Sequence, residues 1–260
     1  MLWLFIALGV VFALALIVAF VWVNNSCLKT TRYKIKIEGA PSLKIVHLSD
    51  LHAKRFGKEN CLLIKKTQKE NPDFIAFTGD IIHKYTKKNN EAALECVSAL
   101  KEIAPVIFVS GNHEMRGIQY RFLRKDLMEA GVTVLDDGVI EIDGVKVAGL
   151  NCASLKNDKI FNITPDKGPK ILLAHKPHFF ERYVAAGYDL VLSGHAHGGQ
   201  WRIPFTDIGV FSPGQGLFPK YSSGVHALGN TKMVISRGLG NSQCPLRLFN
   251  RPEIVVIQIN

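Results

Sequence analysis

Polar residues able to bind metal ions recur between residues 50 and 197, each group directly after a short apolar run rich in Val, Ile, Leu or Phe. Such runs are typical of buried parallel strands, and open α/β sheets bind ligands just beyond the carboxyl ends of their strands. Asp, Asn and His are hard to borderline donors that suit Mn²⁺, Fe or Zn²⁺. These groups therefore predict a metal site, and they are Asp50-Leu51-His52, Gly79-Asp80, Gly111-Asn112-His113-Glu114, Ala174-His175 and Gly194-His195-Ala196-His197.

The order of these motifs resembles that of the calcineurin-like metallophosphoesterases, in which D-x-H, G-D, G-N-H-[DE], H and G-H-x-H follow one another. The resemblance extends over residues 43–259. It implies an α/β fold, a four-layer αββα sandwich, that holds two divalent metal ions. Further stretches resemble the membrane-anchored bacterial branch of the family, which includes phosphodiesterases and UDP-diacylglucosamine pyrophosphatases; they are residues 194–200, 216–221 and 236–240.

The resemblance also implies a role for each motif residue. Asp80 is expected to bridge the two ions, which its place between the other motifs also favours. His113 is expected to be the catalytic residue, facing the substrate to protonate the leaving oxygen or to stabilise charge in the transition state. The remaining metal ligands are Asp50, His52 and His197 for one ion, and Asn112, His175 and His195 for the other.

Two divalent ions about 3.5–4 Å apart can clamp a phosphoryl group and lower the pKa of a water held between them. The expected reaction is attack of this bridging hydroxide on phosphorus, without a covalent phosphoenzyme. The His195-x-His197 spacing predicts two side chains on the same side of an extended segment, so that one loop serves both ions. Mn²⁺ is our first choice of metal, and Fe and Zn²⁺ fit the same donors.

One position departs from the family pattern. Many relatives carry Asp three residues after the bridging Asp, where this chain has His83. That Asp often supports the catalytic His through a hydrogen bond, so the sequence does not predict which group supports His113. A lone His is more commonly a hydrogen-bonded structural residue than a ligand, but four in the family order favour the metal site.

The amino-terminal segment predicts a membrane anchor. Residues 2–23 carry no charge and no Pro, and about 20 apolar residues span a bilayer as a helix. The run is longer than the apolar region of a cleaved signal peptide, no basic region precedes it, and no A-x-A site follows. We expect a transmembrane anchor at residues 1–24, a linker and edge strand at 25–42, and a catalytic domain at 43–260.

The basic charge of the chain bears on its partners. The net charge of +10 lies outside the anchor and favours anionic lipid headgroups or a phosphorylated substrate as partners. Lys54 and Arg55 follow the first motif, and they either contact substrate or belong to a solvated surface.

Five scattered Cys without a C-x-x-C pair favour free thiols in a reducing compartment. The basic residues just after the anchor place the catalytic domain on the cytoplasmic face of the cell membrane; they are Lys29, Arg32, Lys34 and Lys36.

Alternating apolar runs and helical patterns predict right-handed βαβ crossovers and a parallel core. Buried strands are expected at residues 43–48, 74–77, 106–109, 171–174 and 190–192. Helices are expected near 59–70, 91–103 and 118–130. An edge strand at 33–37, hairpins at 139–150 and 225–236, and a last strand at 254–259 complete the domain.

These features predict a membrane-anchored two-metal phosphohydrolase that cleaves a phosphodiester or pyrophosphate bond. A lipid-linked substrate such as UDP-diacylglucosamine is the finer hypothesis, because an anchor suits a substrate that also resides in the bilayer. Phe205 and Phe211 belong either to the core or to a surface that admits an acyl chain. The other residues of this apolar late loop are Leu217, Phe218 and Tyr221.

The motifs leave other functions open. A phosphodiesterase of soluble substrates, such as cyclic nucleotides, uses the same metal site. A non-catalytic scaffold of the same fold typically lacks ligands or the catalytic His, and this chain keeps them. No block of sequence suggests the capping domain of a nuclease, so no nucleic acid partner is expected. Nothing in the sequence predicts the oligomeric state.

Overall fold

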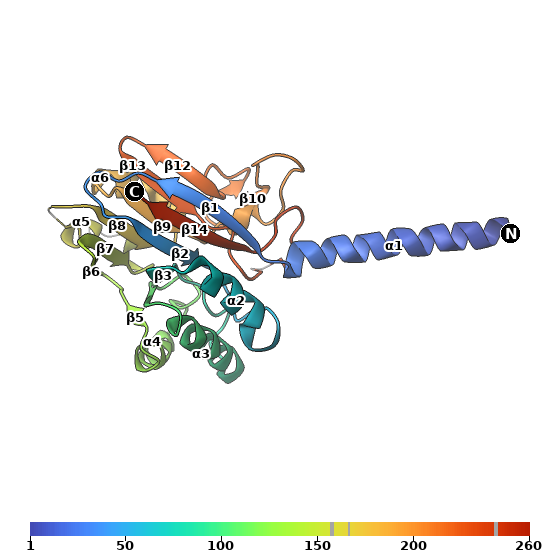
Figure 1. The fold of residues 1–260 in the computed structure, drawn as a ribbon, viewed down its shortest axis with the longest axis horizontal. Coiled ribbons are helices and arrows are strands. Elements are labelled where there is room, and N and C mark those ends of the chain that lie inside the picture. The colour runs from blue at the N-terminus through green and yellow to red at the C-terminus, as the bar shows by residue number, and fades with distance from the viewer. Residues whose placement is uncertain (157–158, 166, 242–243) are drawn as a thin grey trace.

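Two six-stranded sheets form the centre of the domain (Figure 1). The computed structural model describes residues 1–156, 159–165, 167–241 and 244–260. The first sheet has the order β1 (Lys29–Ile35), β14 (Glu253–Ile259), β2 (Leu43–Leu48), β3 (Phe74–Phe77), β4 (Val106–Phe108) and β5 (Thr133–Val134). The second has the order β12 (Gly224–Leu228), β13 (Thr231–Ile235), β9 (Leu190–Ser193), β8 (Lys170–Ala174), β7 (Val145–Leu150) and β6 (Gly138–Ile142).

The strands that precede the motifs are parallel within each sheet. In the first sheet, β2 through β5 run parallel, and β14 pairs antiparallel with β2 and parallel with the edge strand β1. In the second sheet, β7, β8, β9 and β13 run parallel, and the antiparallel partners β6 and β12 form its edges. The two predicted hairpins are confirmed as β6–β7 and β12–β13.

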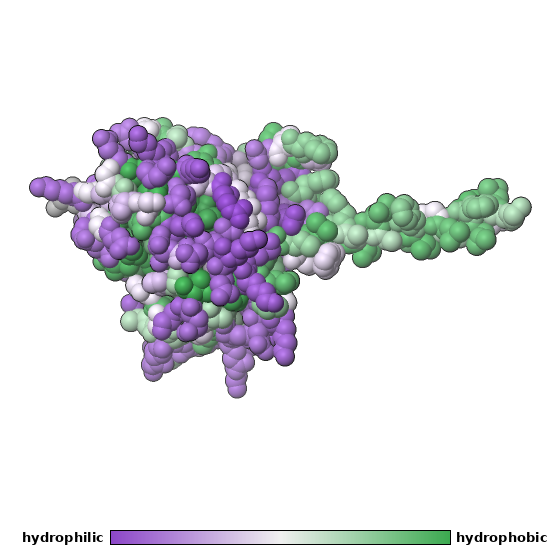
Figure 2. Space-filling model, in the orientation of Figure 1, coloured by the Kyte–Doolittle hydropathy of each residue, from purple (hydrophilic) through white to green (hydrophobic). Residues whose placement is uncertain are grey.

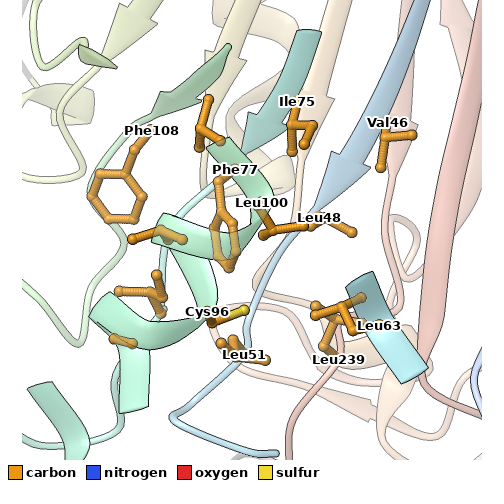
Figure 3. Packing of buried hydrophobic residues seen from close by; sticks show 14 of the residues in the cluster. Val46, Leu48, Leu51, Leu63, Ile75, Phe77, Cys96, Leu100, Phe108 and Leu239 are labelled. Carbon is orange, nitrogen blue, oxygen red and sulfur yellow. The ribbon is translucent and has the colours of Figure 1, made fainter. Parts of the chain in front are cut away.

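Alternate side chains of each central strand enter different hydrophobic layers. In β3, Phe74 and Ala76 pack between the sheets, whereas Ile75 and Phe77 pack under the helices (Figure 3). Because both faces are buried, these strands read as continuous apolar runs. The outer face of the first sheet is covered by α2 (Cys61–Glu70), α3 (Lys87–Lys101) and α4 (Tyr120–Glu129), and that of the second by the shorter α6 (Phe180–Ala185) and α5 (Lys159–Asn162).

The four-layer αββα sandwich is therefore confirmed, but several element boundaries differ from the predictions. Helix α2 begins at Cys61, because Glu59 and Asn60 have left-handed φ values of 51° and 57°. Helix α3 begins at Lys87, earlier than expected, because Thr86 caps it by accepting a hydrogen bond from the Asn89 amide at 3.2 Å. Strand β1 likewise begins before the expected residue, and the short β5 was not predicted.

Helix α1 (Leu2–Ser26) projects away from the domain (Figure 1). It is long and apolar enough to cross a membrane, and its side chains from Leu2 to Ala19 are exposed. Its last turns differ, because Asn24 is buried against the domain. The helix therefore has a free apolar part and a short polar part that joins it to the domain.

Candidate metal centre

All seven predicted ligands come together where strands of the two sheets end. Six of their side chains are buried and Asn112 is half-buried. They follow β2, β3 and β4 of the first sheet and β8 and β9 of the second. Stacking the two sheets brings these strand ends together, so residues far apart in the sequence become neighbours.

The first group contains Asp50, His52 and His197. The Nε2 atom of His197 lies 3.2 Å from Oδ1 of Asp50 and 3.3 Å from Nε2 of His52. One donor atom from each residue lies within 4.8 Å of the others. This arrangement suits binding of a single cation.

The second group surrounds His175. Its Nε2 atom lies 3.3 Å from Asp80 Oδ2, 3.1 Å from His195 Nδ1 and 3.2 Å from Asn112 Oδ1. The same Asp80 oxygen lies 4.0 Å from His52 Nε2, in the first group. Asp80 is thus the carboxylate between the two groups, where the sequence predicted a bridge.

The protonation of these side chains fits cation binding. Burial lowers the pKa of His52 to about 3 and those of His195 and His197 well below the usual value, so these imidazoles are neutral and their nitrogen lone pairs are free to bind a metal. Burial also lowers the pKa of His175, but the Asp80 carboxylate outweighs this effect and raises it to about 9. The neutral rings of His52 and His197, whose Nε2 atoms face one another at 3.3 Å beside the Asp50 carboxylate, form a donor set that a divalent cation fits.

Hydrogen bonds from the surrounding chain orient the donors. The Ser49 hydroxyl and the His195 amide both donate to Oδ2 of Asp50, at 2.6 and 3.0 Å. His175 donates from Nδ1 to the Thr78 carbonyl at 2.7 Å, which directs Nε2 toward Asp80. Such outer contacts fix ring orientation and tautomer in metal sites.

Backbone strain is concentrated at the predicted ligands. A left-handed conformation costs an L-residue roughly 1–2 kcal/mol, and such strain clusters at functional sites. The expectation that the His195-x-His197 segment is extended is wrong, because both residues are left-handed and His197 begins the 3₁₀ turn η4 (His197–Gly199). The turn nevertheless places the two histidines in different groups. The left-handed residues, with their φ values, are Asp50 (54°), His52 (52°), Asp80 (52°), His195 (64°) and His197 (48°).

Two glycines permit the close approach of the loops after β3 and β4. A Cβ atom on Gly79 would lie 2.4 Å from the backbone nitrogen of Gly111. A Cβ atom on Gly111 would lie 2.2 Å from Oδ1 of Asp80. The glycines of the G-D and G-N-H motifs are therefore required by packing of one loop on the other.

His113 faces the centre from the loop after β4. Its Nε2 atom lies 3.9 Å from Oδ2 of Asp80, and its ring centroid lies 4.8 Å from that of His52. Its Nδ1 atom lies 2.7 Å from the backbone carbonyl of His83, to which it can donate a hydrogen bond. A main-chain group thus supplies the support that the family's Asp side chain would give.

Glu114 has a role that the motif alone did not reveal. Its carboxyl group is buried and accepts hydrogen bonds from the amides of Asp80, Gly111 and Ile82, at 2.7, 2.8 and 3.2 Å. Burial, followed by the nearby Asp80 charge, raises its pKa to about 8. Glu114 therefore joins the loop after β3 to the loop after β4.

Arg247 and Asn250 lie beside the first group, although no motif marks them. The Arg247 guanidinium is buried, and its Nη2 atom donates to the carbonyls of Arg237 and Gly240 and lies 3.4 Å from His197 Nδ1. Asn250 donates to the His197 carbonyl at 2.7 Å. Both residues fix the position of the His197 loop, and only the tertiary structure shows this.

The same two residues bind the end of α1. The amide of Asn250 donates to Asn24 at 3.1 Å, and the amide of Arg247 donates to Asn25 at 2.9 Å. Lys54 donates to the Asn25 carbonyl, and Arg55 pairs with Glu95 at 2.5 Å. Lys54 and Arg55 thus contact the protein itself, and Lys54 contributes to the junction between helix and domain.

Replacing Gly111 with Ala is expected to lower both metal content and stability, because the new methyl group displaces Asp80. Overpacking costs about 1–3 kcal/mol, which lowers the Tm of a domain of this size by roughly 2–4 °C per kcal/mol. Metal content measured by elemental analysis and Tm measured by calorimetry test this. Gly138→Ala is the control, since its Cβ would meet only the flexible Leu135 side chain, at 3.2 Å. Full metal content in Gly111→Ala would contradict the expectation.

His83→Ala is expected to retain nearly full phosphohydrolase activity, since the contact to His113 is made by the backbone carbonyl of residue 83. His113→Ala is expected to lose about 10²–10⁴ in kcat, the usual contribution of a general acid. Steady-state kinetics of the two variants provide the comparison. A loss in His83→Ala as large as that in His113→Ala would mean that the His83 side chain takes part.

Comparison with known proteins identifies the family. The sequence model of the calcineurin-like phosphoesterases matches residues 43–199. The metallophosphoesterase YkuE of Bacillus subtilis (strain 168) is 30% identical over 247 residues, which cover 89% of this chain and 85% of YkuE. Phosphodiesterase YaeI of Escherichia coli (strain K12) is 29% identical over 230 residues, which cover 85% of this chain and 84% of YaeI.

More distant similarities agree with these matches. A Danio rerio transmembrane protein with a metallophosphoesterase domain is 26% identical, over 88% of this chain and 56% of its own length. The solved structure of Haemophilus influenzae NAD nucleotidase shares the fold, with a TM-score of 0.50, 15% identity, and coverage of 76% of this chain and 45% of that one. The chain belongs to the calcineurin-like phosphoesterases and is a metal-dependent phosphoester hydrolase.

Proposed function

We propose that this protein is a membrane-anchored two-metal enzyme that cleaves a phosphodiester or pyrophosphate bond in a lipid-linked substrate. The observation that carries the proposal is the pair of donor groups that meet at Asp80. Each group offers at least three ligand side chains, and one oxygen of Asp80 faces both groups, which places them side by side.

Asp50, His52 and His197 are proposed to hold one ion, and Asn112, His175 and His195 the other, with Asp80 shared between them. When bound, the two divalent ions supply a hydroxide near neutral pH and neutralise phosphoryl charge. The proton that Asp80 and His175 share must leave when a cation binds, since both side chains then act as ligands. Mn²⁺ is the metal we propose, on the basis of the mixed oxygen and nitrogen donors.

His113 is proposed as the group that protonates the leaving oxygen or stabilises charge in the transition state. Its Nε2 atom faces Asp80 while its Nδ1 atom is held by the His83 carbonyl, so the ring presents one nitrogen to the reacting group. The adjacent His52 ring limits rotation of the imidazole. These contacts keep the proton donor at a fixed position beside the metal donors.

The apolar part of α1 is proposed to cross the membrane. Its side chains are exposed along the helix from Met1 to Phe20, an arrangement that is unfavourable in water and favourable in lipid. Basic residues that follow it favour a cytoplasmic domain. Asn24 and Asn25 at its end accept hydrogen bonds from Asn250 and Arg247, and Asn250 in turn donates to the His197 carbonyl. The proposed metal centre would therefore lie near the bilayer, within reach of a lipid-linked substrate.

Catalysis is tested with the full chain in detergent, stripped of metal and then supplied with Mn²⁺. We expect hydrolysis of bis(p-nitrophenyl) phosphate that Asp80→Asn lowers by about 10³-fold or more, since metal ions contribute several kcal/mol. His226→Ala serves as the histidine control, because His226 lies in β12 and contacts the Ser223 carbonyl.

The choice of substrate is tested in the same preparation. If kcat/KM for UDP-diacylglucosamine far exceeds that for cyclic nucleotides and other soluble diesters, the lipid-linked proposal holds. The reverse order of kcat/KM would favour a phosphodiesterase of soluble substrates. Absence of turnover with any of these substrates, despite bound metal, would refute the proposed reaction.

The proposed anchor is tested by truncation. Deleting residues 1–23 is expected to move the protein from the carbonate-resistant membrane fraction to the soluble fraction, while Asn24 and Asn25 remain to complete the junction. Fusing a fluorescent protein and, separately, alkaline phosphatase to the carboxyl terminus reports the orientation. Fluorescence without phosphatase activity is the expected outcome, and active phosphatase would place the domain on the other side of the membrane.

A further inference from the structure

A cavity of about 610 Å³ opens beside the end of α1, and none of the metal-site residues lines it. Asn24 of the helix lines one side of it. The cations that line it come from segments far apart in the sequence, since Lys29 begins β1, Arg202 follows η4, and Arg237 and Arg251 flank the loop that carries Arg247. The fold therefore gathers four positive charges at the point where the helix leaves the domain.

The positive charge of this cavity is only partly neutralised. Arg202 pairs with Asp207 at 2.9 Å, and Arg237 lies 3.7 Å from the buried Glu253. Within the described residues, the Arg237 Nε atom is buried without a hydrogen-bond partner. Burial, and then repulsion from Arg237, lowers the pKa of Arg202. An anion in the cavity would relieve this repulsion.

The remaining two cations have no acidic partner among the described residues. Arg251 donates to the carbonyls of Cys27 and Leu28, at 3.0 and 3.1 Å, which orient its guanidinium but leave its charge in place. Lys29 is exposed at the edge of the cavity. The cavity thus has an excess of positive charge and donors able to bind an anionic group.

Apolar side chains form the rim of the same cavity. Phe205 is fully exposed, and Phe249 is 46% exposed and packs against Phe20 of α1, with 4.9 Å between ring centroids. The alternative that Phe205 and Phe211 belong to the core is wrong, because both are exposed. Figure 2 shows apolar surface on the domain beside the base of the helix. The apolar rim is therefore continuous with the apolar surface of α1.

The backbone holds these aromatic rings outward under strain. Phe205 and Phe249 have φ values of 61° and 53°, and a bulky residue with positive φ is a true outlier. Strain of this kind persists where the surrounding structure enforces it, often at a ligand site. A fully exposed aromatic side chain in a strained conformation is best explained by a hydrophobic partner outside the chain.

We propose that this cavity binds the anionic headgroup of a membrane phospholipid, with Phe205 and Phe249 at the boundary of the acyl chains. A phosphate-bearing headgroup matches the four cations, and the apolar rim selects a lipid over a soluble phosphate. The position beside α1 places the cavity at the depth of the headgroups if the helix spans the bilayer. This inference is separate from the proposed reaction, since it uses no residue of the metal centre.

Lipid bound here would fix the domain relative to the bilayer. Arg237 and Arg251 flank the segment that contains Arg247 and Asn250, which contact the His197 loop. The lipid site and the junction with α1 thus hold the same segment from two sides. The metal centre then keeps one orientation toward the membrane surface.

Native mass spectrometry of the full chain in non-ionic detergent tests the proposal. We expect phosphatidylglycerol to be retained in preference to phosphatidylcholine. The double variant Lys29→Gln/Arg251→Gln is expected to weaken retention of phosphatidylglycerol by about fivefold for each charge removed. Phe205→Ser is expected to weaken retention of both lipids by about tenfold, through loss of apolar contact. Lys29 and Phe205 are exposed, so their replacement does not disturb packing.

Matched controls lie on α4, where Arg124→Gln and Phe122→Ser change exposed residues of the same types and are expected to leave retention unchanged. Equal retention of the two lipids, or an unaltered double variant, would overturn the proposal. So would competition by glycerol 3-phosphate as strong as that by the lipid, which would indicate a soluble phosphate ligand. Asp80→Asn is expected to retain lipid normally. The double variant is expected to hydrolyse bis(p-nitrophenyl) phosphate normally in detergent. These two results distinguish failure of the lipid site from failure of the proposed reaction.

Discussion

The carboxylate of Asp80 is the contact on which the arrangement of the metal centre depends. It is buried, one oxygen accepts the His113 amide at 2.8 Å, and the other faces His175 and His52. A carboxylate in this position is stable only where charge and hydrogen-bond donors surround it. The donors come from both sheets, so the sheets must stack with these strand ends together.

Apolar packing on both faces of each sheet supports this polar centre. Side chains between the sheets fix their relative position, and those under the helices fix the outer layers. This rigid frame can maintain left-handed residues at Asp50, Asp80 and His195, which the local sequence would not adopt alone. The strain is offset by burial elsewhere, and the surrounding frame holds the donors at fixed positions.

The carboxyl-terminal end of α1 is part of the catalytic domain's structure, whereas the rest of the helix is the proposed anchor. Asn24 and Asn25 bind backbone groups of Asn250 and Arg247, and Asn250 binds the His197 loop. A short chain of hydrogen bonds therefore connects the helix to a proposed metal ligand. This connection gives the proposed anchor a direct structural link to the proposed metal site.

The sequence by itself determined the buried strands, the polar residues that follow them and the apolar length of α1. Each depends on local pattern: a strand buried on both faces must be apolar throughout, and each predicted ligand directly follows such a strand. Local pattern also led to errors. It predicted an extended segment at His195, which has a left-handed backbone, and it allowed a place in the core for Phe205, which is exposed.

Only the tertiary structure decided how distant residues meet. No spacing rule predicts that Arg247 lies beside His197, that the His83 carbonyl supports His113, or that Lys29 and Arg251 line one cavity. These contacts involve backbone groups and irregular loops, whose positions follow from how the two sheets and α1 pack. Side-chain type determines which chemistry is available, whereas the packing of the layers determines which side chains can take part in it.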